Sequence, residues 1–229
     1  MTTRSAYQQF ERRPVVEGLQ PSTDVRSTTG RPPVTSTDHL CQIAIELFVS
    51  QGFEATSIDD ITAAAGIGRR TFFRYFETKA DAVWGDFDSA IVGLRTSLDS
   101  SPASEPMMDA LRNAVVAFNY LPQDQVQQHR QRMQLILGVP ALISRSSLRY
   151  AQWRAAIEEF AARRLDLPLD HLIPRSIGHT ALGAALAAHE QWLQDETSDL
   201  GTLLNSAFLA LSQGFSPQYT NHTNHAKGI

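Results

Sequence analysis

The sequence predicts an all-α protein with an N-terminal three-helix helix-turn-helix domain and a larger C-terminal helical bundle, about nine helices in all. Apolar residues recur at three- and four-residue spacing along most of the chain. Proline or glycine stands at most of the joints between these segments, and no segment alternates convincingly as a strand would. With 42% hydrophobic and 19% charged residues, the chain has ordinary globular composition.

The helices can be placed in order from caps, stops and apolar stripes. In the first helix, Leu40, Ala44 and Phe48 belong to one apolar stripe, Ser36 or Thr37 caps the start, and Gly52 ends it. Three more helices follow. The second helix of the chain ends at Gly66, and Thr78 caps the fourth. The expected ranges of all nine helices are 36–52, 57–65, 69–76, 78–94, 104–120, 123–137, 144–166, 171–194 and 197–214.

Composition divides the chain into four expected segments. Residues 1–33 hold four prolines and few large apolar side chains, so we expect a flexible N-terminal arm. Residues 34–82 form the helix-turn-helix domain and residues 83–214 the domain for ligand binding and dimerisation. The polar residues 215–229 are expected to be a disordered tail.

Several functional classes are disfavoured. A single cysteine, Cys41, excludes an internal disulfide framework and a multi-cysteine zinc site. The N-terminus lacks the apolar core of a secretory signal, and no apolar run is long enough to span a bilayer, so we expect a cytoplasmic protein without a membrane partner. No phosphate-binding glycine loop or nucleophile motif is present, and His129, His171, His179 and His189 lack metal spacing. We therefore expect no enzyme activity, catalytic residue, metal or cofactor.

The segment 56–79 carries the chemistry that indicates DNA binding. Two short helices are joined by a glycine turn, and on the second one Phe72 and Phe76 lie one turn apart and should face inward. Arg70 and Arg74 then lie on the opposite, exposed face. Such a face suits contact with bases and phosphates in a major groove, although a merely solvated basic face is the alternative. The net charge of −4 argues only against nonspecific coating of nucleic acid.

Residues 35–88 resemble the DNA-binding domain of TetR-family repressors. The pattern runs from Ala44 through Leu47-Phe48 and Gly52-Phe53-Glu54-Ala55-Thr56-Ser57 to Thr71-Phe72-Phe73-Arg74-Tyr75-Phe76 and Lys79. The resemblance implies a homodimer whose reading helices enter successive major grooves of double-stranded operator DNA. The chain departs from the family pattern at Gly68, where serine is usual and the cap is weakened, and at Phe73, which cannot donate a hydrogen bond to phosphate.

The resemblance also implies roles for individual residues. Arg69, Arg70 and Thr71 would read bases or nearby phosphates. Tyr75 and Lys79 would hold phosphate, with help near Thr56 and Ser57, and Arg31 could extend the arm into a minor groove or stay solvated. The implied DNA-binding set is Arg31, Thr56, Ser57, Arg69, Arg70, Thr71, Phe73, Arg74, Tyr75 and Lys79.

A second resemblance concerns residues 76–88. This segment and the proline-bearing arm are similar to the regulators associated with mycofactocin biosynthesis clusters, which implies a sensor of fatty acyl-coenzyme A. For Trp84-Gly85-Asp86-Phe87 within it, we favour packing between the first and fourth helices over contact with a ligand.

The C-terminal half offers a candidate cavity and a candidate interface. The expected effector pocket comprises Phe118, Met133, Leu137, Arg149, Trp153, Ile157 and Phe160, although apolar helix faces are usually core. Five arginines, Arg130, Arg132, Arg145, Arg149 and Arg154, could receive phosphates or a carboxylate at its mouth, or could instead form surface ion pairs. The expected dimer interface comprises Ala181, Ala185, Ala188, Leu203, Leu204, Ala207 and Leu211, with packing in the chain's own core as the alternative.

These observations favour a ligand-responsive transcriptional regulator, a repressor released from its operator by a small apolar or amphipathic effector such as a long-chain acyl-coenzyme A. The alternatives are a helical-bundle enzyme that uses His179 or His189 with Glu190, and an adaptor bundle without DNA binding. The enzyme lacks a nucleophile signature, and the adaptor would be expected to have lost the basic helix.

Overall fold

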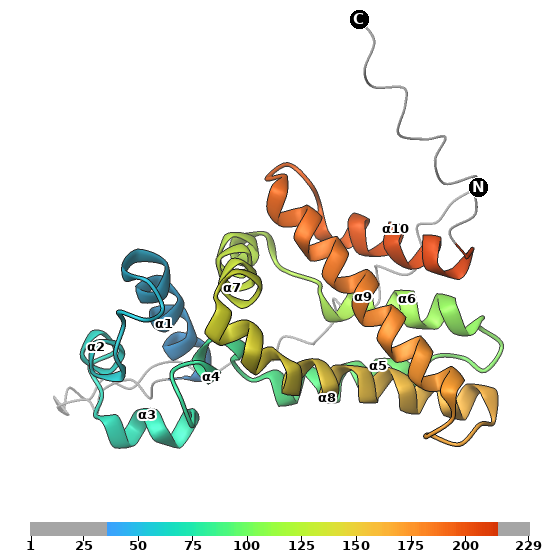
Figure 1. The fold of residues 1–229 in the computed structure, drawn as a ribbon, viewed down its shortest axis with the longest axis horizontal. Helices are drawn as coiled ribbons and strands as arrows, with labels where there is room; N and C mark the ends of the chain where they lie inside the picture. Colours follow the sequence, from blue (N-terminus) through green and yellow to red (C-terminus); the bar gives the residue numbers. More distant parts are fainter. Residues whose placement is uncertain (1–35, 215–229) are drawn as a thin grey trace, which may run out of the picture. The chain divides into compact units, whose positions relative to one another are not determined.

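The computed structural model describes residues 36–214, and within them it is all-helical, as predicted (Figure 1). The α-helices are α1 (Thr37–Gln51), α2 (Ile58–Ala64), α3 (Arg69–Tyr75), α4 (Asp81–Trp84), α5 (Phe87–Asp99), α6 (Met107–Phe118), α7 (Val126–Gly138), α8 (Pro140–Leu165), α9 (Leu172–Gln194) and α10 (Leu200–Ser212). A 3-10 turn at Gln123–Gln125 precedes α7. The predicted arm, Arg31 and the predicted tail lie outside the described residues.

The first three helices pack on one another and have caps and stops that the sequence predicted. The Ser36 hydroxyl accepts the His39 N–H at 3.1 Å, and Gly52 ends α1 at a φ of 92°. Gly66, at a φ of 64°, follows α2 in the left-handed conformation that the sequence predicted. The side chains of Phe48 and Phe72 are fully buried between the helices.

The expected fourth helix is divided into two, which corrects the predicted range 78–94. Gly85 separates α4 from α5 at φ 64° and ψ −146°, a conformation open essentially to glycine alone. A Cβ at this position would also lie 3.4 Å from Cys41 Sγ. Asp86 then starts α5 by accepting the Ser89 N–H at 3.2 Å. The apolar stripe continues across the break because both helices pack on the same core, so periodicity alone could not show it.

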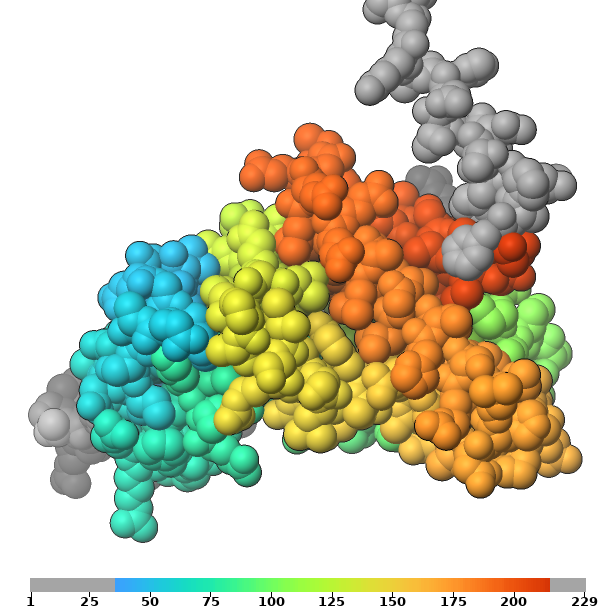
Figure 2. Space-filling model, viewed as in Figure 1, coloured from blue at the N-terminus to red at the C-terminus, as the bar shows by residue number. Residues whose placement is uncertain are grey.

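The C-terminal helices are layered around α9. It packs against α8 and α10, while α10 also contacts α6 and α5 contacts both α6 and α8. Together α9 and α10 form the orange and red surface in Figure 2. The helix expected from residue 144 begins earlier, at Pro140, because proline fits the first turn of a helix. No helix within residues 36–214 is long and apolar enough to cross a membrane.

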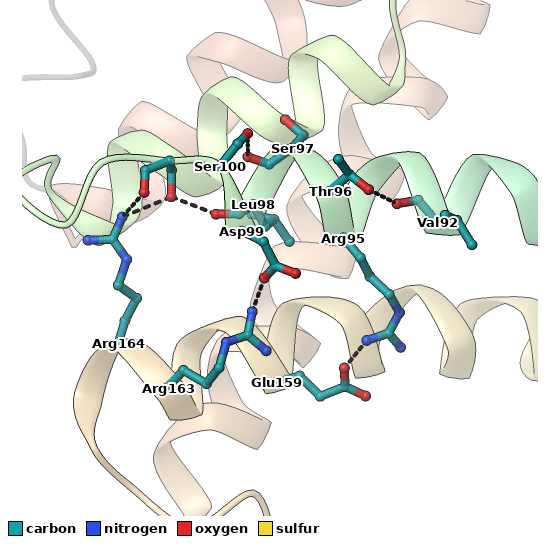
Figure 3. Close-up of polar contacts among 11 residues, drawn as sticks. Val92, Arg95, Thr96, Ser97, Leu98, Asp99, Ser100, Glu159, Arg163 and Arg164 are labelled. Atoms are coloured by element: carbon teal, nitrogen blue, oxygen red, sulfur yellow. Dashed lines mark hydrogen bonds and ion pairs between the residues drawn. The ribbon is translucent and has the colours of Figure 1, made fainter.

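Polar contacts join α5 to the C-terminal half of α8 (Figure 3). Arg95 pairs with Glu159, and Arg163 pairs with Asp99. Arg164 donates to the Ser101 hydroxyl at 2.8 Å and to the Pro102 carbonyl at 2.7 Å, so it holds the loop that leaves α5. The ion pairs of Arg95 and Arg163 are partly or well exposed, so each contributes little to the free energy of unfolding.

A buried arginine on α7 fixes the turn between α9 and α10. The Arg130 guanidinium donates to the backbone carbonyl of Trp192 and, at 3.1 Å, to that of Asp195. It also lies 4.1 Å from the centroid of the Trp192 ring. Arg130 is only 6% exposed, so neither alternative offered for it, an effector's phosphate or a surface ion pair, describes its position. Its role is to satisfy the carbonyls that α9 leaves unpaired at its end.

Candidate nucleic-acid interface and internal cavity

Helix α3 presents a basic and aromatic face to solvent. Arg69, Arg70, Phe73 and Arg74 are exposed, and Phe73 retains 47% of its surface. Phe72 points the other way into the core, 5.4 Å from the ring of Phe76, as the spacing predicted. Gly68 supplies no side-chain cap at the start of α3.

The three arginines of α3 differ in how far they are engaged. One terminal nitrogen of Arg69 donates to both carboxylate oxygens of Asp59 at 2.9 Å, in a pair that is more than half exposed. Arg74 donates to the Tyr75 hydroxyl at 3.3 Å and lies over its ring. Arg70 makes no hydrogen bond or ion pair with another described residue. Its guanidinium is therefore available to a base edge or a phosphate without breaking an existing contact.

The side chains of Thr56 and Lys79, both in the predicted DNA-binding set, bond to backbone carbonyls of the chain itself. Thr56 is 1% exposed, and its hydroxyl donates to the Gly52 carbonyl at 2.9 Å. The Lys79 ammonium donates to the carbonyls of Phe53 at 2.6 Å and Thr56 at 2.9 Å, and lies 4.4 Å from the Phe53 ring centroid. Lys79 thus closes the loop between α1 and α2.

Ser57 is exposed, but its polar groups are also engaged. In a capping box, its N–H and hydroxyl donate to the Asp60 carboxylate at 2.8 Å and 2.6 Å. These two hydrogen bonds lower the pKa of Asp60. Of the predicted DNA contacts, those on α3 therefore fit the observed geometry best.

A partly open internal cavity of about 300 Å³ lies among α1, α4, α5, α6, α7, α8 and α9. It includes three of the predicted pocket residues, Phe118, Met133 and Trp153. The other four, Leu137, Arg149, Ile157 and Phe160, do not line it, which corrects that part of the prediction: Ile157 and Phe160 are buried in the core, and Arg149 pairs with Asp88 at 3.1 Å. The cavity is also lined by Trp84, Phe87 and Arg132, for which the sequence left ligand contact as an alternative. Sequence reasoning missed further lining residues, among them His129, Tyr150, Leu182, Leu186 and His189.

Trp84 connects this cavity to the helix-turn-helix. It lines the cavity from α4, and its ring makes edge-to-face contacts with Phe87 at 5.3 Å and Tyr150 at 5.9 Å. Trp84 and Phe87 also pack against the hydrophobic core, as the sequence favoured, so they combine packing with a position on the cavity wall. Helix α4 itself packs against α1 and α7. A molecule in the cavity would therefore touch a helix that packs directly on α1.

Two histidines bring titratable groups to the cavity. Burial, with the nearby His189 and the positive charge of Arg132, lowers the pKa of His129 to about 3. Burial also lowers the pKa of His189, whose Nδ1 lies 2.8 Å from the Ala185 carbonyl oxygen. Both rings are therefore neutral near pH 7. Within residues 36–214, no group of histidines, cysteines and carboxylates could hold a metal ion.

The remaining arginines of the predicted anion-binding set are mostly occupied. Arg145 donates to the Thr78 hydroxyl at 3.3 Å, and Arg154 lies 3.9 Å from a carboxylate oxygen of Glu158. Only Arg132 of the five lines the cavity. Arg149 and Arg154 thus form the ion pairs with nearby acids that the sequence offered as the alternative, and Arg132 is the member of the set that could contact a molecule in the cavity.

Four of the seven residues of the predicted dimer interface are buried within the single chain. Ala181, Ala185, Ala188 and Leu204 are at most 6% exposed within the single chain, so a second copy could not reach them without unpacking α9 and α10. This part of the prediction is corrected. Leu203, Ala207 and Leu211 are partly exposed on α10 and stay available to a partner.

Comparison with known proteins identifies both halves of the chain. Residues 41–82 match the model of bacterial regulatory proteins of the tetR family, and residues 105–216 match that of the MftR C-terminal domain. The chain is 41% identical over 188 residues to the proposed mycofactocin biosynthesis transcriptional regulator MftR of Mycobacterium tuberculosis, covering 82% of this chain and 95% of that protein. The regulator TcmR of Streptomyces glaucescens is 26% identical over 72% of this chain and 76% of its own length.

Solved structures show the same fold at low identity. A SmeT–triclosan complex superposes with a TM-score of 0.56 at 17% identity, over 76% of this chain and 90% of that one. The FadR repressor of Thermus thermophilus in complex with lauroyl-CoA superposes with a TM-score of 0.51 at 20% identity, over 79% and 95%. With the match to MftR, the conclusion is that this chain belongs to the TetR family of transcriptional regulators and carries a C-terminal domain of the MftR type.

Proposed function

We propose that this regulator is a homodimeric repressor that binds double-stranded operator DNA through α3 and leaves it when an effector occupies the internal cavity. In this proposal, residues 34–82 bind DNA in the cytoplasm, and residues 83–214 bind the effector and the second subunit. The observation that carries it is the position of Trp84, which lines the cavity from a helix that packs on α1. Effector and DNA would then affect each other's affinity reciprocally.

The DNA part rests on the free guanidinium of Arg70 and the exposed basic face around it. Replacing Arg70 with alanine should relax discrimination between operators by about 1–3 kcal/mol if a base contact is lost. If Arg70 instead contacts phosphate, the variant should bind all sequences more weakly and with a shallower salt dependence. Arg163→Ala is the matched control, because Arg163 is an exposed arginine on α8. Equal binding and salt slope in both variants would refute the assignment of α3.

For the effector we propose a long-chain acyl-coenzyme A whose acyl chain enters the cavity. The walls formed by Phe87, Phe118, Met133 and Trp153 suit a hydrocarbon chain, which gains about 0.8 kcal/mol per buried methylene. The similarity to MftR and to the lauroyl-CoA-bound FadR supports this class. The apolar ligand named with SmeT shows that this fold also accepts other apolar molecules.

A titration of the DNA complex tests the effector class. Fluorescence polarisation of a labelled fragment from the gene's own promoter should fall on addition of acyl-coenzyme A, with affinity rising with chain length until the cavity is full. Free coenzyme A should not release the protein. Leu186→Trp, which fills the cavity, should bind DNA but resist release, whereas Leu172→Trp, at a position 72% exposed, should respond normally. Release by free coenzyme A, or by no chain length, would remove this class.

The dimer is proposed to form through the exposed sides of α9 and α10. Leu203 and Leu211 are the larger partly exposed apolar residues of the predicted interface. The double substitution Leu203→Asp and Leu211→Asp should therefore give folded monomers by light scattering and circular dichroism. A wild-type chain that is monomeric at micromolar concentration would contradict the proposal.

A further inference from the structure

The internal cavity is surrounded by polar atoms that have no partner. Among the described residues, five buried side-chain nitrogens make no hydrogen bond, and four of them belong to residues lining this cavity. They are Trp84 Nε1, both ring nitrogens of His129, and Arg132 Nε. Buried polar groups in proteins are usually paired, so such a concentration at one cavity calls for a physical explanation.

The unpaired nitrogens come from two helices that face each other. His129 and Arg132 stand three residues apart on α7 and so share a face, while Trp84 approaches from α4. The His129 ring lies 6.0 Å from that of His189 and 5.8 Å from that of Trp192, which hold its orientation. His189 Nδ1 lies within hydrogen-bond distance of the Ala185 carbonyl oxygen. Of these two histidines, His129 is therefore the one without a hydrogen-bond partner.

These nitrogens are mainly hydrogen-bond donors. The indole Nε1–H and the guanidinium Nε–H can only donate, and a neutral imidazole has one donor and one acceptor. Burial lowers the pKa of His129 to about 3, so its ring is neutral at pH 7. Three donors against one acceptor match a group that carries oxygen lone pairs.

We propose that Trp84, His129 and Arg132 form a subsite for an acceptor oxygen of the effector, a carbonyl or carboxylate oxygen held inside the cavity. The aromatic and aliphatic walls then hold the hydrocarbon part. This inference rests on the proposed function, because it places the polar group of an effector in the same cavity. It adds that the cavity selects for an oxygen-bearing hydrocarbon over a plain hydrocarbon of equal length.

Binding of three eight-carbon probes tests the subsite: octanoate, methyl octanoate and octane, followed by tryptophan fluorescence, since Trp84 and Trp153 line the cavity. The wild-type protein should bind an oxygen-bearing probe at least tenfold more tightly than octane. His129→Phe and Arg132→Met should each reduce this preference to less than threefold, while Arg163→Met, outside the cavity, should retain it. Tighter binding of octanoate than of the ester identifies a carboxylate; equal binding identifies a carbonyl.

The outcomes separate this inference from the proposed function. If all three probes bind equally and still release DNA, the subsite is wrong and the effector cavity stands. If the preference survives in both His129→Phe and Arg132→Met, the subsite is also wrong. If no probe binds while a long-chain acyl-coenzyme A still releases the protein from DNA, the subsite is wrong and the effector cavity stands; if neither acts, both are overturned. Thermal unfolding of each variant guards against loss of fold, and His129→Phe should melt no lower than wild type because it removes unpaired buried nitrogens.

Discussion

Acidification should destabilise this protein before its carboxylates titrate, because His129 is buried as a neutral ring. Its pKa is about 3 in the folded chain against an ordinary 6.5. Between these values the unfolded chain binds a proton that the folded chain does not, so the free energy of unfolding falls as the pH falls. The contribution of His129 is fully present above pH 6.5. The difference between the two pKa values corresponds to a fall of about 2 kcal/mol in the free energy of unfolding between pH 7 and pH 5.

Urea unfolding followed by circular dichroism at pH 7, 6 and 5 measures this loss. The pKa values of Asp60, Asp86 and Asp195 are lowered below 3.8, so these carboxylates contribute little in that window. The variant His129→Phe keeps an aromatic ring without a titratable group and should lose much of the slope, with His189 accounting for the rest. A wild-type protein equally stable at pH 7 and pH 5 would refute the assignment of a buried neutral His129.

Three further substitutions have expected outcomes in the same unfolding assay. Arg130→Met should lower the free energy of unfolding by about 2–4 kcal/mol, because it leaves the Trp192 carbonyl and its neighbours buried without a charged donor. A loss below about 0.5 kcal/mol, the size expected of a neutral surface change, would contradict this. Lys79→Met should lower the free energy of unfolding by about 1–2 kcal/mol, because the Phe53 and Thr56 carbonyls lose their donor. Unchanged stability with weaker DNA binding would show instead that Lys79 binds phosphate. Gly85→Ala should cost about 1–3 kcal/mol through its backbone conformation, and an unchanged unfolding midpoint would refute that strain.

Local signals allowed the helix-turn-helix to be predicted in detail. The cap at Ser36, the stop at Gly66 and the inward Phe72 each depend on residues within one or two turns, where propensity and periodicity are informative. The division at Gly85 escaped prediction because a glycine in a helical pattern signals a break only when its backbone dihedral angles are known.

The site residues could be predicted only where no distant partner competes for them. The sequence shows that Lys79 and Arg130 are basic but not that backbone carbonyls 23 and 62 residues away bind them. In the same way, the cavity joins side chains from helices far apart in the chain, so His129 and Trp84 could not be paired from spacing. The segment 84–87 did carry a usable signal, since two aromatic residues flank a glycine at a helix junction.

An effector that packs on Trp84 could supply most of the coupling that the proposed regulation needs. A hundredfold change in DNA affinity requires about 2.7 kcal/mol of coupling between effector and DNA. Full burial of a large apolar side chain contributes about 1.5–3 kcal/mol, so an effector that packs on Trp84 in only one arrangement of α4 could supply most of that difference. Helix α4 has four residues and packs on α1, so a change in its position would be passed directly to the DNA-binding domain. Trp84→Ala should therefore preserve operator binding but lower the ratio of DNA affinities measured without and with effector, and an unchanged ratio would show that the coupling runs through another contact.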